Sequence, residues 1–436
     1  MAKCTASVMK LPRCQRRQVE AAFSGGNITS DGGVLLLREV DRRIGLSKAI
    51  NQVLADPRHP ELVHHSQLSL LRQRLYGLCL GYEDLNDHEQ LRHDIALQTA
   101  VNRDEPLASP STLCRLENRI DKSAALAFHQ VLIDQFIASY DRTPKRLVLD
   151  FDATDDRVHG QQEGRFFHGY YDHYCFLPLY VFCGKQLLVS YLRPSNIDGA
   201  KHSWAVLALL VKRLRQSWPK VRITLRADSG FCRWRMLRWC ETHGVDYIVG
   251  LAKNARLIRA VAETEAALAT AFARTGQAAR RFDSFAYQAK SWDRQRRIIA
   301  KLDYSEKGTN PRFVVTNRGE PPQWLYHHYC ARGEMENRIK EQQLGLFADR
   351  TSCHYWWANQ CRLLWASLAY VLLEALRRIA LAGTELVNAQ VGTIRLKVLK
   401  IGAVMIRNTR RIRVLLSSAY PYQDLFQTLL ARLVPG

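Results

Sequence analysis

The sequence contains no uninterrupted apolar run long enough to cross a membrane. Its longest apolar helical stretch, residues 363–376, is interrupted by Ser367 and Glu374, whereas a spanning helix needs about 20 mostly apolar residues. The first residues, MAKCTASVMKLPRCQRRQ, are partly basic but lack the apolar core of a secretion signal. We therefore expect no membrane partner and a cytoplasmic location.

The cysteines follow no pairing pattern. Eleven are scattered over 436 residues, and none forms a C-x-x-C pair. Zinc ribbons and disulfide frameworks need recurring spacings, so the sequence supports neither. We interpret most of these cysteines as buried thiols. Internal repeats and low-complexity tracts are also absent from the sequence.

Acidic residues are scarce relative to basic ones. The chain has 63 Lys and Arg against 41 Asp and Glu, a formal charge of +22 and a pI near 9.7. Such a balance favours a polyanionic partner, and nucleic acid first. The hydrophobic share of 47% is typical of a folded globular protein, and the length allows two to four domains.

Residues 1–143 predict an all-helical domain, with helices expected over about 31–44, 66–80, 84–101 and 124–140. Ser109 or Ser111 can cap a further short helix that carries Arg115 and Arg119. A short helix with projecting arginines after a tight turn resembles a helix-turn-helix recognition helix. DNA binding through Arg115 and Arg119 is therefore one interpretation, and an ordinary amphipathic surface helix is the other.

From Pro144 the pattern changes to alternating strands and helices. RLVLDFDAT alternates with period two, and two further strands flank the turn at Gly184. The strands VRITLRADSGF and DYIVGLA follow, each after a helix. The predicted order is β-β-β-α-β-α-β, an α/β fold in which carboxylates end the first and fourth strands.

Asp150 and Asp152 share one face of the first strand, and Asp228 ends the fourth. Burying a carboxylate in a strand of Val, Leu and Phe is costly without a partner. A strand end that reaches solvent would explain these residues without function. A metal site is the alternative, because sites in open α/β sheets form at strand ends.

Residues 253–325 predict a helix followed by an antiparallel set of strands, which we interpret as a β-rich insertion in the α/β domain. Trp292 lies in a turn among several arginines. Basic residues beside an aromatic suit nucleic acid. An exposed hairpin anchored by one tryptophan explains the pattern equally well.

On a helix with about 100° per residue, five polar residues of the stretch 329–343 share one narrow face: Tyr329, Arg332, Glu336, Lys340 and Gln343. Met335 and Ile339 point elsewhere, towards a core. A surface helix with a Glu336–Lys340 ion pair is the simpler reading. A helix that holds a metal with Glu336 and phosphates with the other polar residues is the functional interpretation.

A long apolar helix is expected over 355–380, followed by a basic C-terminal segment, 386–436, with short strands. That segment suits a DNA-facing sheet or a solvated sheet edge protected by charge.

Asp152, Asp228 and Glu336 meet in the inferred fold, at two strand ends and a helix across the sheet. Three carboxylates repel one another unless cations lie between them, and hard divalent cations bind oxygen ligands. Two such ions can activate water or a 3′-hydroxyl and stabilise the leaving oxygen of a phosphodiester. Tyr329 and Arg332 are placed to hold a phosphate.

The motifs D-A-T at Asp152, R-A-D-S-G-F around Asp228 and Y-x-x-R-x-x-x-E ending at Glu336 resemble those of the Asp-Asp-Glu transposases of bacterial insertion sequences. Within them, the chain resembles the group with a Tyr-Arg-Glu-Lys signature and a β insertion before the Glu. HGQQEG, FFHGYYD and ENRIKE are most similar to the thirteen-eighty insertion-sequence family. The similarity runs from ITSDGG to the last expected helix.

This resemblance implies an RNase H-like catalytic domain, residues 144–252 and 326–385, with the insertion at 253–325 and a helical DNA-binding domain before it. It implies cut-and-paste transposition with Mg²⁺ or Mn²⁺, two ions, held by Asp152, Asp228 and Glu336. Asp152 is preferred to Asp150 because it directly precedes Ala-Thr. Trp292 resembles an aromatic that stacks on a flipped base in relatives.

The signature lysine falls at position 343, where this chain has Gln343, and Lys340 lies one turn earlier.

The implied partners are transposon terminal inverted repeats, target DNA and, in the synaptic complex, a second copy of the chain. The implied location is bacterial and nucleoid-associated. Two alternatives remain, namely an RNase H-fold nuclease that cuts without joining, and a non-catalytic repressor derived from a transposase.

Overall fold

The structure is a computed structural model that describes residues 7–434. It divides into two compact units. Unit 1 contains the residues up to Ile120, Gly345–Phe347 and the residues from Leu368 onwards, and unit 2 contains Asp121–Leu344 and Ala348–Ser367. Residues 1–6 and 435–436, the ends of the expected N- and C-terminal segments, lie outside the described residues. The domain boundaries expected from the sequence stay predictions, because the division into two compact units does not show which stretch binds DNA or catalyses a reaction.

Unit 2 is built on a nine-stranded mixed sheet with the order β12-β13-β15-β11-β10-β4-β8-β9, and β14 pairs with β13. In chain order, its strands are β4 (Arg146–Ala153), β8 (Leu179–Cys183), β9 (Gln186–Tyr191), β10 (Arg222–Ala227), β11 (Asp246–Leu251), β12 (Ala279–Tyr287), β13 (Arg296–Ser305), β14 (Gly308–Thr309) and β15 (Arg312–Thr316). Strands β4, β10 and β11 are parallel, and their other neighbours run antiparallel. The expected β-β-β-α-β-α-β order of residues 144–252 is confirmed for this sheet, but three further short strands between residues 156 and 176 form a separate sheet.

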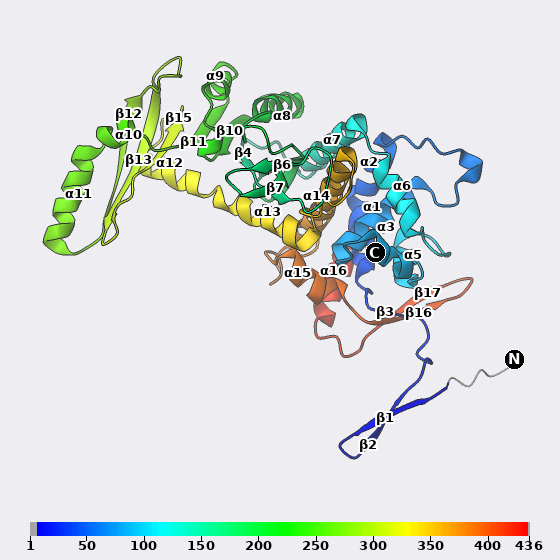
Figure 1. Cartoon of the computed structure of the whole chain (residues 1–436). Helices are drawn as coiled ribbons and strands as arrows, with labels where there is room; N and C mark the ends of the chain where they lie inside the picture. Colours follow the sequence, from blue (N-terminus) through cyan, green and yellow to red (C-terminus); the bar gives the residue numbers. More distant parts are fainter. Residues whose placement is uncertain (1–6, 435–436) are drawn as a thin grey trace. The chain divides into compact units, whose positions relative to one another are not determined.

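The period-two pattern of β4 explains how the sheet packs. Leu147, Leu149 and Phe151 point to one face and are at most 2% exposed. They share a core with helices α8 (Ser203–Ser217) and α9 (Trp234–Thr242), which lie on the same side of the sheet in Figure 1. On the other face, Leu325 and Tyr326 of α12 (Pro322–Cys330) pack on Ile248, Ile299 and Val314.

The strands of the expected insertion extend this sheet. β15 pairs with β11 through Val315 opposite Val249, and β13 and β12 follow outwards. Helices α10 (Ala255–Ala260) and α11 (Ala262–Thr275) precede them. A second, three-stranded sheet combines β5 (Asp156–Arg157), β7 (His173–Phe176) and β6 (Phe166–His168). Helix α7 (Lys122–Ala138) is joined to β9 by His129 Nε2, which lies 3.0 Å from the Ser190 carbonyl oxygen.

The stretch 329–343 is not one helix, which corrects that expectation. Helix α12 ends at Cys330 and α13 (Gly333–Leu346) begins after a turn, as the consecutive helices in Figure 1 show. Short i+3 hydrogen bonds cross this turn, from Arg332 N to Tyr329 O and from Met335 N to Arg332 O. Glycine, at position 333, is a poor helix former, which helps to explain why the break occurs here. Met335 and Ile339 are buried, as expected.

Helices form most of unit 1. They are α1 (Val34–Ile44), α2 (Leu46–Val53), α3 (Gln67–Leu80), α4 (His88–Leu91), α5 (Ile95–Val101), α6 (Pro110–Asn118), α15 (Val391–Ile394) and α16 (Gln423–Leu433), with the second half of α14 (Trp356–Ile379). Gly45 ends α1 with φ of 68°, a conformation that glycine adopts without strain. The single helix expected over 84–101 is interrupted, because Asp94 caps a new helix by accepting a hydrogen bond from Leu97 N.

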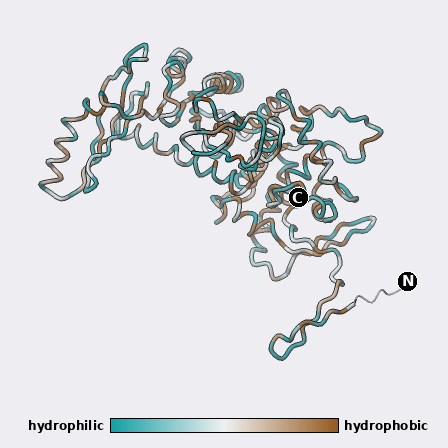
Figure 2. The backbone as a smooth tube through the Cα atoms, viewed as in Figure 1, coloured by the Kyte–Doolittle hydropathy of each residue, from teal (hydrophilic) through white to brown (hydrophobic). Residues whose placement is uncertain are grey.

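The expectation of an all-helical N-terminal domain is wrong. An exposed hairpin, β1 (Met9–Cys14) with β2 (Arg17–Ala21), begins the described chain, and Figure 2 shows its hydrophilic turn. Further on, β3 (Ile28–Thr29) pairs with β16 (Ala403–Arg407), which pairs with β17 (Ile412–Leu416). The short strands expected in the basic tail are therefore present, but residues 391–399 are helical instead.

Half of the ten described cysteines are buried, while Cys14, Cys114 and Cys330 are exposed. Cys4 lies outside the described residues. Within residues 7–434, every helix is too short or too polar to span a membrane.

Candidate active site

Asp152 and Asp228 lie at the same edge of the sheet in unit 2. Strands β4 and β10 are parallel neighbours with Phe151 opposite Ala227, so the next residue of each strand is an aspartate. Asp228 also shapes the following turn, because its Oδ1 accepts a hydrogen bond of 2.9 Å from Gly230 N. Adjacent parallel strands thus carry both carboxylates to one place.

Arg332 connects the first of these aspartates to Glu336. Its Nη1 lies 3.4 Å from Asp152 Oδ2, and its Nη2 lies 2.7 Å from Glu336 Oε1. The Asp152 side chain is only 14% exposed, whereas that of Glu336 is 46% exposed. One guanidinium therefore neutralises two carboxylates that come from a strand end and from the first turn of α13.

The charge state of Asp152 reflects this crowding. Burial raises its pKa to about 7, the nearby Arg332 guanidinium lowers it, and the carboxylates of Asp228 and Glu336 raise it further. The three acidic groups are therefore coupled electrostatically. A cation placed among them would favour their ionised forms.

Asp150, the other aspartate on this face of β4, is already paired. Arg226 of β10 approaches it with Nε at 2.5 Å from Oδ1 and Nη2 at 2.7 Å from Oδ2. The same arginine donates from Nη1 to the His328 carbonyl oxygen, at 2.6 Å. Arg226 thus links β10 to Asp150 of β4 and to His328 of α12, an arrangement that the sequence pattern did not reveal.

Tyr329, in the last turn of α12, lies above Gly250 of β11. A Cβ atom on Gly250 would be 2.6 Å from the Tyr329 hydroxyl and 2.8 Å from Ser229 N. Burial raises the pKa of Tyr329, so the phenol is a hydrogen-bond donor at neutral pH. The sequence analysis missed Gly250, although an isolated glycine inside an apolar strand is a known sign of close approach.

The polar face expected for 329–343 divides into two environments. Lys340 is exposed. Gln343 instead points into unit 2, where its Nε2 donates to Asp156 Oδ1 at 3.0 Å and to the Asp155 carbonyl oxygen at 3.3 Å. Asp156 is fully buried, and burial raises its pKa to about 8. Its Oδ2 has no hydrogen-bond partner among the described residues.

Trp292 is 7% exposed and belongs to the core of unit 2. Its ring packs edge-on against Tyr287, with centroids 5.7 Å apart, and the Arg296 guanidinium lies 5.4 Å from its centroid. In this conformation, the ring already has protein partners.

The two arginines expected in a recognition helix lie at α6 in unit 1. Arg115 is exposed, and its Nη2 donates to Thr112 Oγ1 at 2.9 Å. Arg119, at the end of the helix, donates to Asp56 Oδ1 at 2.9 Å and to Gln67 Oε1 at 2.7 Å. Arg119 thus fastens α6 to neighbouring segments, whereas Arg115 is oriented to solvent.

The donor set at Asp152, Asp228 and Glu336 suits a hard divalent cation in its chemistry. Carboxylate oxygens are the ligands that Mg²⁺ and Mn²⁺ prefer. Over the part of the chain that the structure describes, no three His, Cys, Asp or Glu side chains are already gathered as a ligand cluster. The Arg332 guanidinium instead supplies positive charge to two of these three carboxylates.

The chain is similar to a solved structure and matches a family model. No curated protein matches the chain. A piggyBac transposase in a synaptic complex with hairpin DNA is 12% identical, with a TM-score of 0.45, and the match covers 84% of this chain and 79% of that one. The family model described as "Transposase DDE domain group 1" matches residues 11–435, almost the whole sequence. The chain therefore belongs to the DDE transposases and is an enzyme of that type.

Proposed function

We propose that this transposase cuts DNA at the ends of its own element and joins the freed ends to target DNA, as a cut-and-paste enzyme. We assign it to the Tyr-Arg-Glu-Lys signature group and, within that, to the thirteen-eighty family of bacterial insertion sequences. The observation that carries the proposal is the Arg332 guanidinium between Asp152 and Glu336, beside the strand end that bears Asp228. An arginine shared by two carboxylates at a strand edge suits a site built for phosphate.

The strand order supports an RNase H-like catalytic domain. From β9 to β11, the order is β9-β8-β4-β10-β11, with two antiparallel strands followed by three parallel ones. In this proposal β12, β13 and β15 are the insertion, and they enlarge the same sheet.

In the proposed site, Asp152, Asp228 and Glu336 would hold Mg²⁺ or Mn²⁺, with two ions expected. Bound there, such ions activate water or a 3′-hydroxyl and stabilise the leaving oxygen. Arg332 binds a non-bridging phosphate oxygen once the carboxylates have other cationic partners. The Tyr329 hydroxyl donates a hydrogen bond to the same phosphate group and so fixes the orientation of the phosphate.

The proposed partners are transposon ends and target DNA, which a net charge of +22 favours. Lys340, Gln343, Trp292, Arg115 and Arg119 stay predicted DNA-binding residues. A homodimer in the synaptic complex would hold two ends together. The proposed location is the bacterial nucleoid, where the substrate lies.

A cleavage assay tests this function. Purified protein is incubated with a labelled duplex that carries the element's own end, with Mg²⁺ or with EDTA, beside Asp228→Ala and the exposed control Asp141→Ala. We expect metal-dependent nicking at the end and joined products, both lost only in Asp228→Ala. Cutting without joining would indicate a nuclease, and binding without cutting would indicate a DNA-binding protein. Activity that survives Glu336→Ala would overturn the assignment of the site.

A further inference from the structure

A hollow of about 220 Å³ opens directly beside Tyr329 in unit 2. Among its lining residues are Ser229, Gly250, Lys253, Arg312, Tyr326 and Tyr329. Ser229 follows Asp228, and Tyr329 lies one turn before Arg332. A group bound in this hollow would therefore lie next to the candidate active site, because the segments 228–229 and 329–332 contribute residues to both.

The hollow is positively charged. Lys253 and Arg312 are both exposed, and no acidic side chain lines the hollow. Lys253 Nζ lies 3.4 Å from the amide oxygen of Asn310, a neutral partner. Within residues 7–434, Arg312 has no ion-pair partner. Two cationic side chains thus face the same space without a carboxylate to neutralise them.

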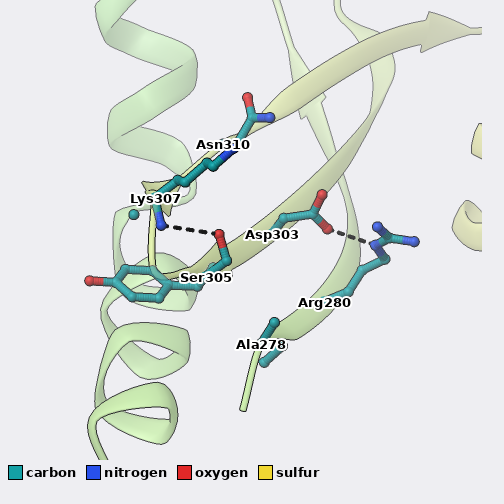
Figure 3. Close-up of a pocket in the computed structure, with 9 residues that line it drawn as sticks. Ala278, Arg280, Asp303, Ser305, Lys307 and Asn310 are labelled. Carbon is teal, nitrogen blue, oxygen red and sulfur yellow. Dashed lines mark hydrogen bonds and ion pairs between the residues drawn. The ribbon is translucent and has the colours of Figure 1, made fainter. Parts of the chain in front are cut away.

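A second hollow, of about 400 Å³, provides a contrast (Figure 3). It is lined in part by Ala278, Arg280, Asp303, Ser305, Lys307 and Asn310. Here Arg280 is neutralised, because its Nε lies 2.6 Å from Asp303 Oδ1, as the dashed line in Figure 3 marks. Asp303 also pairs with Lys301. The arginine of the second hollow thus has a carboxylate partner, whereas Lys253 and Arg312 of the first hollow, beside Tyr329, have none among the described residues.

Its surroundings suit a sugar-phosphate chain better than a free base. The rings of Tyr326 and Tyr329 are tilted by 51° with centroids 6.0 Å apart, so they do not form two parallel walls for stacking. Tyr326 is only 9% exposed. The available groups are hence two exposed cations and the hydroxyls of Ser229 and Tyr329, which are typical phosphate ligands.

We propose that Lys253 and Arg312 bind the backbone phosphate next to the scissile one, on the DNA strand that leaves the active site past Tyr329. This site rests on the proposed function and extends it, because it specifies where the strand runs. Neutralising a phosphate with Lys or Arg releases counterions, and each neutralised phosphate contributes about 0.9 to the magnitude of the slope of log affinity against log salt.

The first test measures binding of the full chain to the labelled end duplex in EDTA, between 50 and 200 mM NaCl. We expect the double variant Lys253→Ala/Arg312→Ala to reduce the magnitude of the salt slope by about one, and each single variant to account for part of that reduction. Arg280→Ala, the matched control with a paired guanidinium, should leave the slope unchanged. The melting temperatures should also stay unchanged, because both cations are exposed.

The second test replaces single phosphates around the cleavage position by uncharged methylphosphonates. The wild-type protein should lose affinity when the neighbouring phosphate is neutral. The double variant Lys253→Ala/Arg312→Ala should be insensitive at that linkage alone, and Arg312→Ala should lose less affinity there than the wild type does. Equal salt slopes for Arg312→Ala and the wild type, or equal sensitivity at every linkage, would overturn the phosphate site. If the wild type neither binds nor cuts the duplex, the proposed function fails and this site with it. If it binds and cuts while the variants behave as the wild type, only this site fails.

Discussion

The guanidinium of Arg226 holds both oxygens of Asp150, at 2.5 and 2.7 Å, only two residues before Asp152 on the same strand. Both partners are buried. A buried ion pair that loses one member leaves an uncompensated charge, which costs about 3–5 kcal/mol. Substitution of Asp150 should therefore reduce stability, whereas substitution of Asp152 should reduce cleavage.

We expect Asp150→Asn to lower the free energy of unfolding by about 3 kcal/mol, measured by urea denaturation. Asp152→Asn should abolish end cleavage without lowering stability, because it removes a buried carboxylate whose pKa is already raised. Cleavage by Asp152→Asn at the wild-type rate would exclude Asp152 from the site.

Substitution of Gly250 tests the approach of Tyr329. The added Cβ of Gly250→Ala would lie 2.6 Å from the Tyr329 hydroxyl and 2.8 Å from Ser229 N, so it would displace the hydroxyl and the backbone next to Asp228. Misplacing a positioning group by about 1 Å can cost 100-fold in rate, so we expect cleavage to fall by about 10- to 100-fold. Gly199→Ala is the control, because nothing lies within 4 Å of its added Cβ. Equal cleavage rates for the two variants would refute a role for this contact.

Asp156 should make stability depend on pH. Its pKa rises from 3.8 when unfolded to about 8 when folded, so the folded state binds the proton more tightly. The contribution of Asp156 to stability is then fully present below about pH 3.8 and is lost as the pH rises towards 8, by up to about 1.4 kcal/mol per unit. Asp156→Asn keeps an acceptor for Gln343 and should remove this fall. The measurement is the free energy of unfolding between pH 5 and 9, and parallel curves for the two proteins would contradict the prediction.

Gln343→Lys restores the signature lysine, and its effect depends on where the side chain points. Because Gln343 contacts Asp156, the new ammonium should pair with that carboxylate and lower its pKa. We expect higher stability at pH 8 and an unchanged salt slope for DNA binding. A slope that steepens by about one would show instead that residue 343 reaches a DNA phosphate.

Trp292 can be tested by separating stability from cleavage. Since its ring is buried against Tyr287 and Arg296, Trp292→Ala should lower the free energy of unfolding by about 3–5 kcal/mol. Trp292→Phe should cost less and retain cleavage below its melting temperature. Loss of cleavage by Trp292→Phe at unchanged stability would favour stacking on a DNA base.

Local patterns predicted much of unit 2. The alternation of β4 identified its buried face, and the ends of β4 and β10 placed Asp152 and Asp228 together because parallel neighbours end at one edge. The partners that complete the site could not be read locally. Arg226 pairs with Asp150 across 76 residues, and Tyr329 meets Gly250 through the packing of α12 on β11. The break between α12 and α13 also escaped a periodicity argument, which assumes continuous helix.

Because Thr29 of β3 pairs with Ala403 of β16, unit 1 cannot finish folding until most of the chain has been synthesised. A ribosome that adds about 5–20 residues per second completes the stretch 121–367 roughly 2–7 s before it adds Ala403. Strand β3 then waits roughly 20–75 s for its neighbour. During that time, helices α1 to α6 lack part of their unit and are open to proteases and chaperones. Translation that stops before Ala403 would leave the proposed catalytic carboxylates in a finished sheet and unit 1 without β16.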